Sequence, residues 1–303
     1  MEGSYPRKLR IWDGSAALVQ DLSGPQGAWM SQGPAPAHQG PHGAADFAER
    51  LYACEALAPA GAAVCGDEGP EPYTLQWFLE IEAKRHSRQG RWIPRLLEFA
   101  KHSGETLLGL GHGLGTDWLQ YARHGAAVVV CSPSGTQLAL VRRNFELRGL
   151  SGRFLHAAPA ALPLEAASID VACISGLLEL VPDPRAVLDE VYRVLKPGGK
   201  VLAVTPARYD VDFWYRLCFF WQRWFTRKPT DPPTPRFSGR GLRRLFGRFT
   251  EHRVHKRHLR RSEVPHLWRW LPLPLLERLL GRVLVIKAFK PLSAALPNTQ
   301  AAA

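Results

Sequence analysis

The chain of 303 residues is 46% hydrophobic, enough apolar material for one large α/β domain or for one domain with appended segments. It carries a net charge of +12, and its five cysteines lack the paired short spacing of a disulfide framework or a zinc site. No apolar stretch approaches the ~20 residues of a membrane span, and residues 1–35 carry Asp, Glu and Gln where a signal peptide is apolar. We therefore expect a cytoplasmic protein, soluble or membrane-peripheral.

Residues 1–70 are rich in Gly, Pro, Ala and His. Such a composition buries too little apolar surface to offset the entropy lost on ordering, so we expect a loose N-terminal arm. From Glu71 the character changes, because Leu75, Phe78, Leu79 and Ile81 recur at helical spacing. A second helix is expected over 93–99, ahead of the first strand.

Glycines alternate with other residues through the centre of Thr106–Trp118, at positions 109, 111, 113 and 115. An apolar run followed by these glycines and then by helical spacing predicts a strand, a tight turn and a helix N-terminus. Glycines let a ligand approach the backbone, and the free N–H groups of a first helical turn favour an anionic or nucleotide-like ligand. The spacing departs from the dinucleotide fingerprint, and a glycine-rich turn without a ligand is the alternative reading.

Further apolar segments predict strands at 126–131, 153–156, 169–175 and 200–205, with helices at 135–148 and 184–195 between them. This alternation predicts a doubly wound, mostly parallel sheet with helices on both faces. Ligands of such sheets bind beyond the carboxyl ends of the strands, at the switch point beside the first strand. The glycine turn stands at that position.

The chain resembles the class I S-adenosylmethionine-dependent methyltransferases of the small-molecule type called type 11, from Glu71 to Pro206 and more faintly to Lys290. The resemblance is carried by four blocks: Gly111–Gly115, Thr116–Arg123, Leu162–Leu164 ahead of Ser168–Val171, and Glu190–Gly199. It implies a seven-stranded sheet whose last strand is antiparallel, with S-adenosylmethionine as the methyl donor. It also implies that Asp170 is a structural anchor near the start of its strand.

The resemblance implies a set of cofactor-binding residues: Tyr73, Gly109, Leu110, Gly111, His112, Gly113, Gly115, Ser132, Pro133, Ala158, Pro159, Ser175 and Gly176. Family members usually carry three acids, which bind the methionine end, the ribose and the adenine; here Gly109, Ser132 and Ala158 replace them. A hydrogen bond to a charged group is worth ~1.5–3 kcal/mol, so each loss weakens binding. Either the site works through backbone N–H groups, a pocket at Gly109 and aromatic contacts, or the protein keeps the fold without the cofactor.

Methyl transfer needs a general base only for hydroxyl or unactivated carbon acceptors. Glu179 is the titratable residue nearest the end of the fourth strand and is the candidate base. The alternative is a solvated residue that opens the next helix.

Beyond Pro206 the segment 211–225 is rich in aromatic residues. Three readings stay open for it: a lid over an aromatic or lipid-like acceptor, a membrane-interface helix, and a buried packing helix. Residues 236–261 then hold nine Arg and one Lys against one Glu, which favours an anionic partner such as a phospholipid surface, or is simply a basic solvated side. No nucleic-acid-binding module is recognisable here.

We therefore predict four segments: a loose arm at 1–70, a methyltransferase core at 71–206, an aromatic and basic insertion with closing strands at 207–290, and a disordered tail at 291–303. The predicted function is methyl transfer from S-adenosylmethionine to a small molecule, and an anionic membrane surface at 211–261 is a further candidate partner. The alternative is a silent binding or scaffold protein of the same fold. The sequence does not indicate the oligomeric state.

Overall fold

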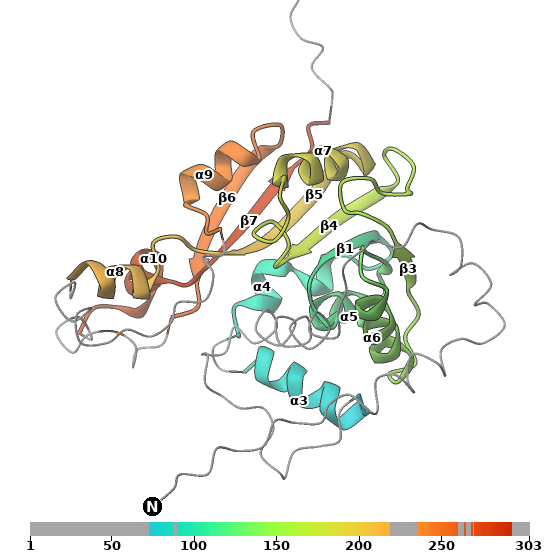
Figure 1. Cartoon of the computed structure of the whole chain (residues 1–303), viewed down its shortest axis with the longest axis horizontal. Coiled ribbons are helices and arrows are strands. Elements are labelled where there is room, and N and C mark those ends of the chain that lie inside the picture. The colour runs from blue at the N-terminus through green and yellow to red at the C-terminus, as the bar shows by residue number, and fades with distance from the viewer. Residues whose placement is uncertain are drawn as a thin grey trace, which may run out of the picture. The chain divides into compact units, whose positions relative to one another are not determined.

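The computed structural model describes residues 73–87, 90–218, 235–259, 264, 268 and 270–292. The predicted N-terminal arm, most of the predicted tail and the second half of the aromatic segment lie outside these residues. The elements before the insertion are α3 (Leu75–Arg85), α4 (Ile93–Leu97), η2 (Phe99–Lys101), β1 (Thr106–Gly111), α5 (Thr116–Arg123), β2 (Ala127–Ser132), α6 (Gly135–Glu146), β3 (Arg153–His156), β4 (Ile169–Ser175), α7 (Pro184–Val194) and β5 (Leu195–Pro206). They are followed by α8 (Val211–Cys218), α9 (Gly239–Leu245), β6 (Thr250–Arg257), α10 (Leu273–Leu280) and β7 (Val283–Phe289) (Figure 1).

The strands form one seven-stranded sheet in the order β3-β2-β1-β4-β5-β7-β6. Strands β1 to β5 pair in parallel, whereas β7 lies antiparallel between β5 and β6. The predicted doubly wound sheet with an antiparallel last strand is therefore confirmed. The order reverses between β1 and β4, which places the crevice for a ligand at the carboxyl ends of these two strands.

Side chains alternate across the sheet and build a core on each face. In β1, Leu108 and Leu110 join the core beneath α7 and α9, and Leu107 joins the core beneath α4, α5 and α6. Figure 1 shows these two groups of helices on opposite sides of the strands. Both faces are covered, as the near-continuous apolar runs of the strands require.

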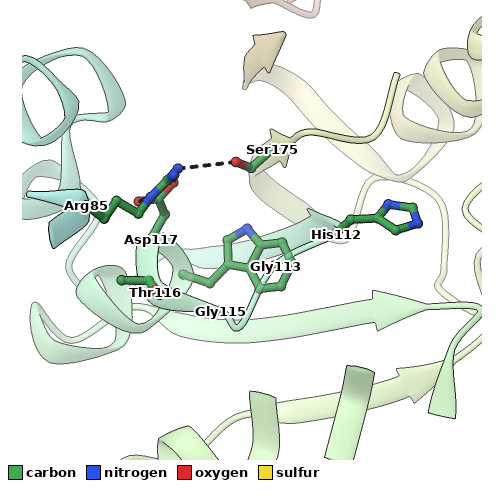
Figure 2. A pocket seen from close by; sticks show the side chains of 8 residues that line it. Arg85, His112, Gly113, Gly115, Thr116, Asp117 and Ser175 are labelled. Carbon is green, nitrogen blue, oxygen red and sulfur yellow. Dashed lines mark hydrogen bonds and ion pairs between the residues drawn. The ribbon is translucent and has the colours of Figure 1, made fainter. Parts of the chain in front are cut away.

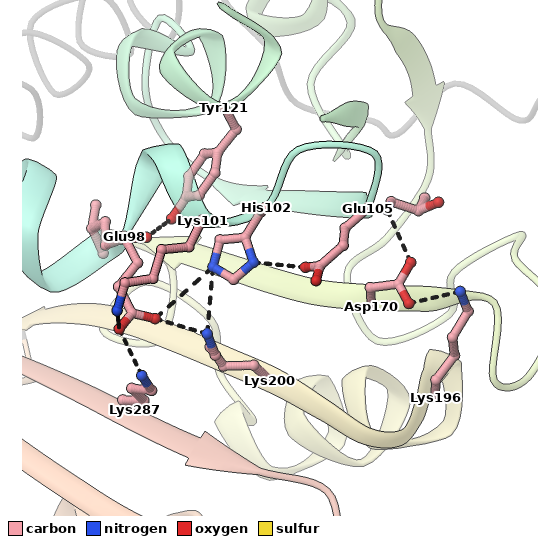
Figure 3. A network of polar contacts seen from close by, with 11 residues as sticks. Glu98, Lys101, His102, Glu105, Tyr121, Asp170, Lys196, Lys200 and Lys287 are labelled. Carbon is pink, nitrogen blue, oxygen red and sulfur yellow. Dashed lines mark hydrogen bonds and ion pairs between the residues drawn. The ribbon is translucent and has the colours of Figure 1, made fainter. Parts of the chain in front are cut away.

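Polar contacts join central strands at the end of the sheet opposite the crevice (Figure 3). Asp170 accepts hydrogen bonds from the Thr106 amide at 2.9 Å and from Lys196 Nζ at 2.7 Å, consistent with an anchor near the start of β4. Glu98 accepts from Lys200 and Lys287 at 2.7 and 2.8 Å, which ties the segment after α4 to β5 and β7. Burial raises the pKa of Glu98, but hydrogen bonds from these lysines outweigh it and lower that pKa to about 2.

Candidate active site

The glycine turn joins β1 to α5 at the crevice. Gly111 has φ of 153°, and a Cβ there would lie 2.0 Å from the carbonyl oxygen of Ser175, so the two strand ends approach too closely for any side chain. Gly115 caps α5 with φ of 76°, and no side chain caps the first turn of this helix. The turn therefore directs backbone N–H groups and the positive end of the helix dipole into the crevice.

A small pocket opens at this turn (Figure 2). It is lined by Arg85, His112, Gly113, Gly115, Thr116, Asp117, Trp118 and Ser175. Four of the predicted cofactor-binding residues thus meet in one pocket, together with four residues that the sequence did not single out. Its free volume is only about 10 Å³, room for about one water molecule, so a ligand that enters the pocket has to displace side chains.

Arg85 and Asp117 form a buried ion pair in the pocket. Arg85 Nε donates to Asp117 Oδ1 at 2.7 Å, Nη2 donates to Oδ2, and each side chain is only 4% exposed. Arg85 Nη2 also reaches Ser175 Oγ at 3.5 Å, the dashed contact in Figure 2. Burial acts to raise the pKa of Asp117, but the Arg85 guanidinium prevails and holds that pKa well below its usual range.

The sequence carried a signal for Arg85 that its interpretation missed. Trp77, Ile81 and Arg85 follow one another at intervals of four residues and are all buried on α3. An arginine that continues the buried stripe of a helix needs a partner inside the protein, because an unpaired charge is costly to bury. Asp117, an acid in the first turn of α5, is that partner.

We expected a pocket beside Gly109, and the structure shows that this space is filled. The space beside Gly109 is filled by Trp118 of α5, since a Cβ on Gly109 would lie 2.7 to 2.9 Å from three atoms of the indole ring. Trp118 is only 2% exposed and belongs to the core beneath α5. A side chain at position 109 would therefore meet the indole ring of Trp118.

Ser132 ends β2 where family members carry the ribose-binding acid, but its hydroxyl is already engaged. It donates to Gln137 Oε1 at 2.6 Å and accepts from the Ser134 amide at 3.1 Å. Gln137 Nε2 in turn donates to the carbonyl oxygens of Gly111 and Gly113, at 2.8 and 2.9 Å. Ser132 and Gln137 are both 1% exposed, so a closed polar network lies across the base of the glycine turn.

The remaining predicted residues do not line the pocket. Tyr73 packs against Trp77 with the rings tilted and their centroids 5.4 Å apart, in a cluster with Leu114, and the Leu110 side chain is buried in the sheet core. Two others make backbone hydrogen bonds: Pro133 O accepts from His156 Nε2 at 2.8 Å, and the Gly176 amide donates to Val204 O at 3.2 Å. Ala158 is exposed and Pro159 is buried. Their cofactor contacts stay predictions.

The position of Glu179 differs from one of the two readings of the sequence. It lies in the turn that follows β4, ahead of α7, and is 8% exposed, so the reading as a solvated residue that opens the next helix is wrong. Its Oε2 atom has no hydrogen-bond partner among the described residues. Burial raises the pKa of the Glu179 carboxyl to about 7. A carboxyl group that ionises near neutrality is suited to proton transfer.

Comparison with known proteins agrees with this architecture. Residues 107–203 match the family described as the methyltransferase domain. A demethylmenaquinone methyltransferase of Clavibacter sepedonicus is 39% identical over 104 residues, 33% of this chain and 40% of the relative. A tRNA 5-carboxymethoxyuridine methyltransferase of Escherichia coli (strain K12) is 33% identical over 97 residues, 31% of this chain and 37% of the relative. A crystal structure of a SAM-dependent methyltransferase from Methanosarcina mazei covers 66% of this chain and 98% of its own, with 20% identity and a TM-score of 0.48.

The glycine turn at the switch point of this sheet, together with the family match, defines the class. The sheet order and the match of residues 107–203, about a third of the chain, to the methyltransferase domain are those of the class I S-adenosylmethionine-dependent methyltransferase fold. The chain spans about two-fifths of the length of the two curated relatives, and their names give two different kinds of acceptor.

Proposed function

We propose that this chain transfers a methyl group from S-adenosylmethionine to a small, lipid-like acceptor. The observation that carries the proposal is the pocket at the glycine turn, where the first turn of α5 meets the buried pair Arg85 and Asp117. S-adenosylmethionine supplies an electrophilic methyl group when bound, and alignment of donor and acceptor provides most of the acceleration.

The residues of the pocket fit the methionine end of the cofactor. An α-amino acid group carries a carboxylate and an ammonium, and the pocket offers the hydroxyl of Ser175 beside the Arg85–Asp117 pair, whose charges bind each other. Backbone N–H groups of the turn add donors for the carboxylate. The Arg85–Asp117 pair forms a fixed polar wall at this end of the pocket.

Glu179 is the residue to which we assign proton removal from the acceptor. It follows Ser175, a lining residue of the pocket, by four positions, and its carboxyl group is buried. Thr205 Oγ1 is a second buried oxygen without a partner among the described residues, and it follows Val204, which pairs with Ser175. These two oxygens lie near the carboxyl ends of β4 and β5 among apolar side chains. They suit an acceptor whose polar group forms hydrogen bonds with them.

The lipid-like acceptor is supported by the name of one relative. The demethylmenaquinone relative acts on a quinone according to its name. The predicted membrane contact through 211–261 stays a prediction, as does the exclusion of nucleic acid as a partner.

One observation favours the alternative of a silent protein with the same fold. The network of Ser132 and Gln137 closes the place where family members bind the ribose, and Trp118 fills the place of the first acid. A ligand that reaches both ends of the site requires Gln137 to release the carbonyl oxygens of Gly111 and Gly113.

Calorimetric titration with S-adenosylhomocysteine separates the two functions. We expect saturable binding by the whole chain and a loss of about tenfold or more in affinity for Arg85→Lys, which keeps the charge and removes the planar fork.

Transfer of labelled methyl from S-adenosylmethionine to a demethylmenaquinone analogue then tests the acceptor. Glu179→Gln should abolish transfer without weakening cofactor binding, whereas Glu165→Gln, an exposed acid in the loop before β4, should change neither. Absence of binding would leave only the silent alternative.

A further inference from the structure

Helix α10 carries apolar side chains on two sides. Leu276 and Leu280 are buried and pack against the small core that includes Val211 of α8. Leu275 and Leu279, one helical turn apart, are 45% and 47% exposed. An ordinary surface helix of a soluble domain has a polar outer face, so this outer face is unusual.

Neighbouring segments extend the exposed apolar surface. Trp270, just before α10, is 79% exposed, and Tyr209 is 43% exposed. Lys256 Nζ joins Tyr209 to the helix, because it donates to the carbonyl oxygens of both Tyr209 and Leu279. We call the surface formed by Tyr209, Trp270, Leu275 and Leu279 the α10 face.

Cations accompany the α10 face. Arg278 is exposed on α10 itself, and Arg208 is exposed beside Tyr209, with its guanidinium 5.8 Å from the centre of that ring. The acid on the helix, Glu277, is directed to Arg257 at 3.6 Å. Figure 1 shows α10 beside α8, beyond β6 and β7 and at a distance from α5 and the glycine turn.

We propose that the α10 face docks on the surface of an anionic lipid bilayer. Leucine and tryptophan side chains enter the boundary between headgroups and acyl chains, and the arginines contact lipid phosphates. A twofold contact between two copies of the chain would place the arginines of one copy near those of the other, and these like charges repel. The phosphates of an anionic bilayer attract the same arginines. No helix in the described residues is long and apolar enough to cross a bilayer. This docking differs from the predicted contact through 211–261 and does not depend on methyl transfer.

Sedimentation of the full chain with vesicles tests the proposal. We expect the protein to sediment with vesicles of equal parts phosphatidylcholine and phosphatidylglycerol, and binding to weaken as salt rises. Leu275→Glu and Leu279→Glu should each reduce the bound fraction by about tenfold or more, because the new carboxylate opposes both insertion and the lipid charge. Leu292→Glu is the matched control, since Leu292 is 83% exposed but lies against the Gly198 turn. Melting temperatures of all variants show whether they fold.

A second pair of variants locates the contact. Arg278→Gln should weaken binding to the anionic vesicles, whereas Arg243→Gln on α9 should not, although both arginines are exposed. No sedimentation of the wild-type chain, or equal effects of Leu279→Glu and Leu292→Glu, would overturn the proposal. An effect of Arg243→Gln alone would move the contact to the basic segment and would also overturn the proposal.

A concentration-dependent dimer that Leu275→Glu abolishes would assign the face to a second copy instead. Loss of cofactor binding would leave these results unchanged, so failure of the proposed enzymatic function is separately visible.

Discussion

Arg85 and Asp117 lie 32 residues apart in the chain and form a two-point ion pair that closes one wall of the pocket. The pair joins the end of α3 to the first turn of α5. Both side chains are buried, so each charge depends on the other for its stabilisation.

Arg85→Ala should therefore lower the free energy of unfolding by about 3–5 kcal/mol, because it leaves the Asp117 carboxylate buried without its partner. Lys84→Ala is the neighbouring control. Lys84 is 53% exposed and pairs with an exposed Glu80, so its loss should cost less than about 0.5 kcal/mol. Urea denaturation of the two variants measures the difference. Similar small effects for both would mean that Asp117 finds other stabilisation.

Glu179→Gln should stabilise the protein at high pH and not at low pH. The pKa of Glu179 is raised from 4.5 to about 7 in the folded chain, so folding disfavours the ionised form. Wild-type stability then falls as pH rises from about 4.5 to 7, and the full cost is present above pH 7. We expect the variant to gain roughly 2–3 kcal/mol at pH 8 and little at pH 4.

The control for this titration is Glu165→Gln, which removes an exposed carboxyl from the loop ahead of β4. Its denaturation midpoint should track that of the wild type across the whole pH range. If Glu179→Gln also tracks the wild type, the carboxyl is solvated in solution and the assignment of a base to it fails.

Gly109→Glu should destabilise the protein and bring no gain in cofactor affinity. Trp118 occupies the space that the new side chain needs, and overpacking of a core costs about 1–3 kcal/mol or more. Gly135→Ala is the control, since nothing lies within 4 Å of its added Cβ in the first turn of α6. Thermal melting separates the two. A Gly109→Glu protein as stable as the wild type would show that Trp118 moves aside readily.

Ser132→Asp restores the acid of the family at the end of β2, yet it should not tighten the binding of S-adenosylhomocysteine. The new carboxylate cannot donate to Gln137 Oε1, and an unsatisfied buried oxygen costs about 1–3 kcal/mol. Ser134→Asp, two residues further on, keeps an N-cap for α6 and should leave stability nearly unchanged. Calorimetry that finds a tenfold tighter Ser132→Asp protein would show that the network opens at little cost.

The sequence by itself determined the order of the elements, the sheet class and the position of the glycine turn. Those features follow from local regularities, because periods of two and 3.6 residues and the glycines of a turn act over a few neighbours. The family resemblance also implied that Asp170 is an anchor at the start of β4, and its hydrogen bonds to the Thr106 amide and Lys196 agree with that.

Only the tertiary structure decided which groups meet in the crevice. The pairing of Arg85 with Asp117, the indole of Trp118 beside Gly109 and the bonds of Gln137 to the glycine turn all join segments that are distant in sequence. The burial of Glu179 likewise depends on packing that no local pattern encodes, so only the structure shows that this candidate base is not a solvated residue. Local periodicity reports which face of an element is apolar, whereas the partner of each polar side chain is set by how whole elements pack together.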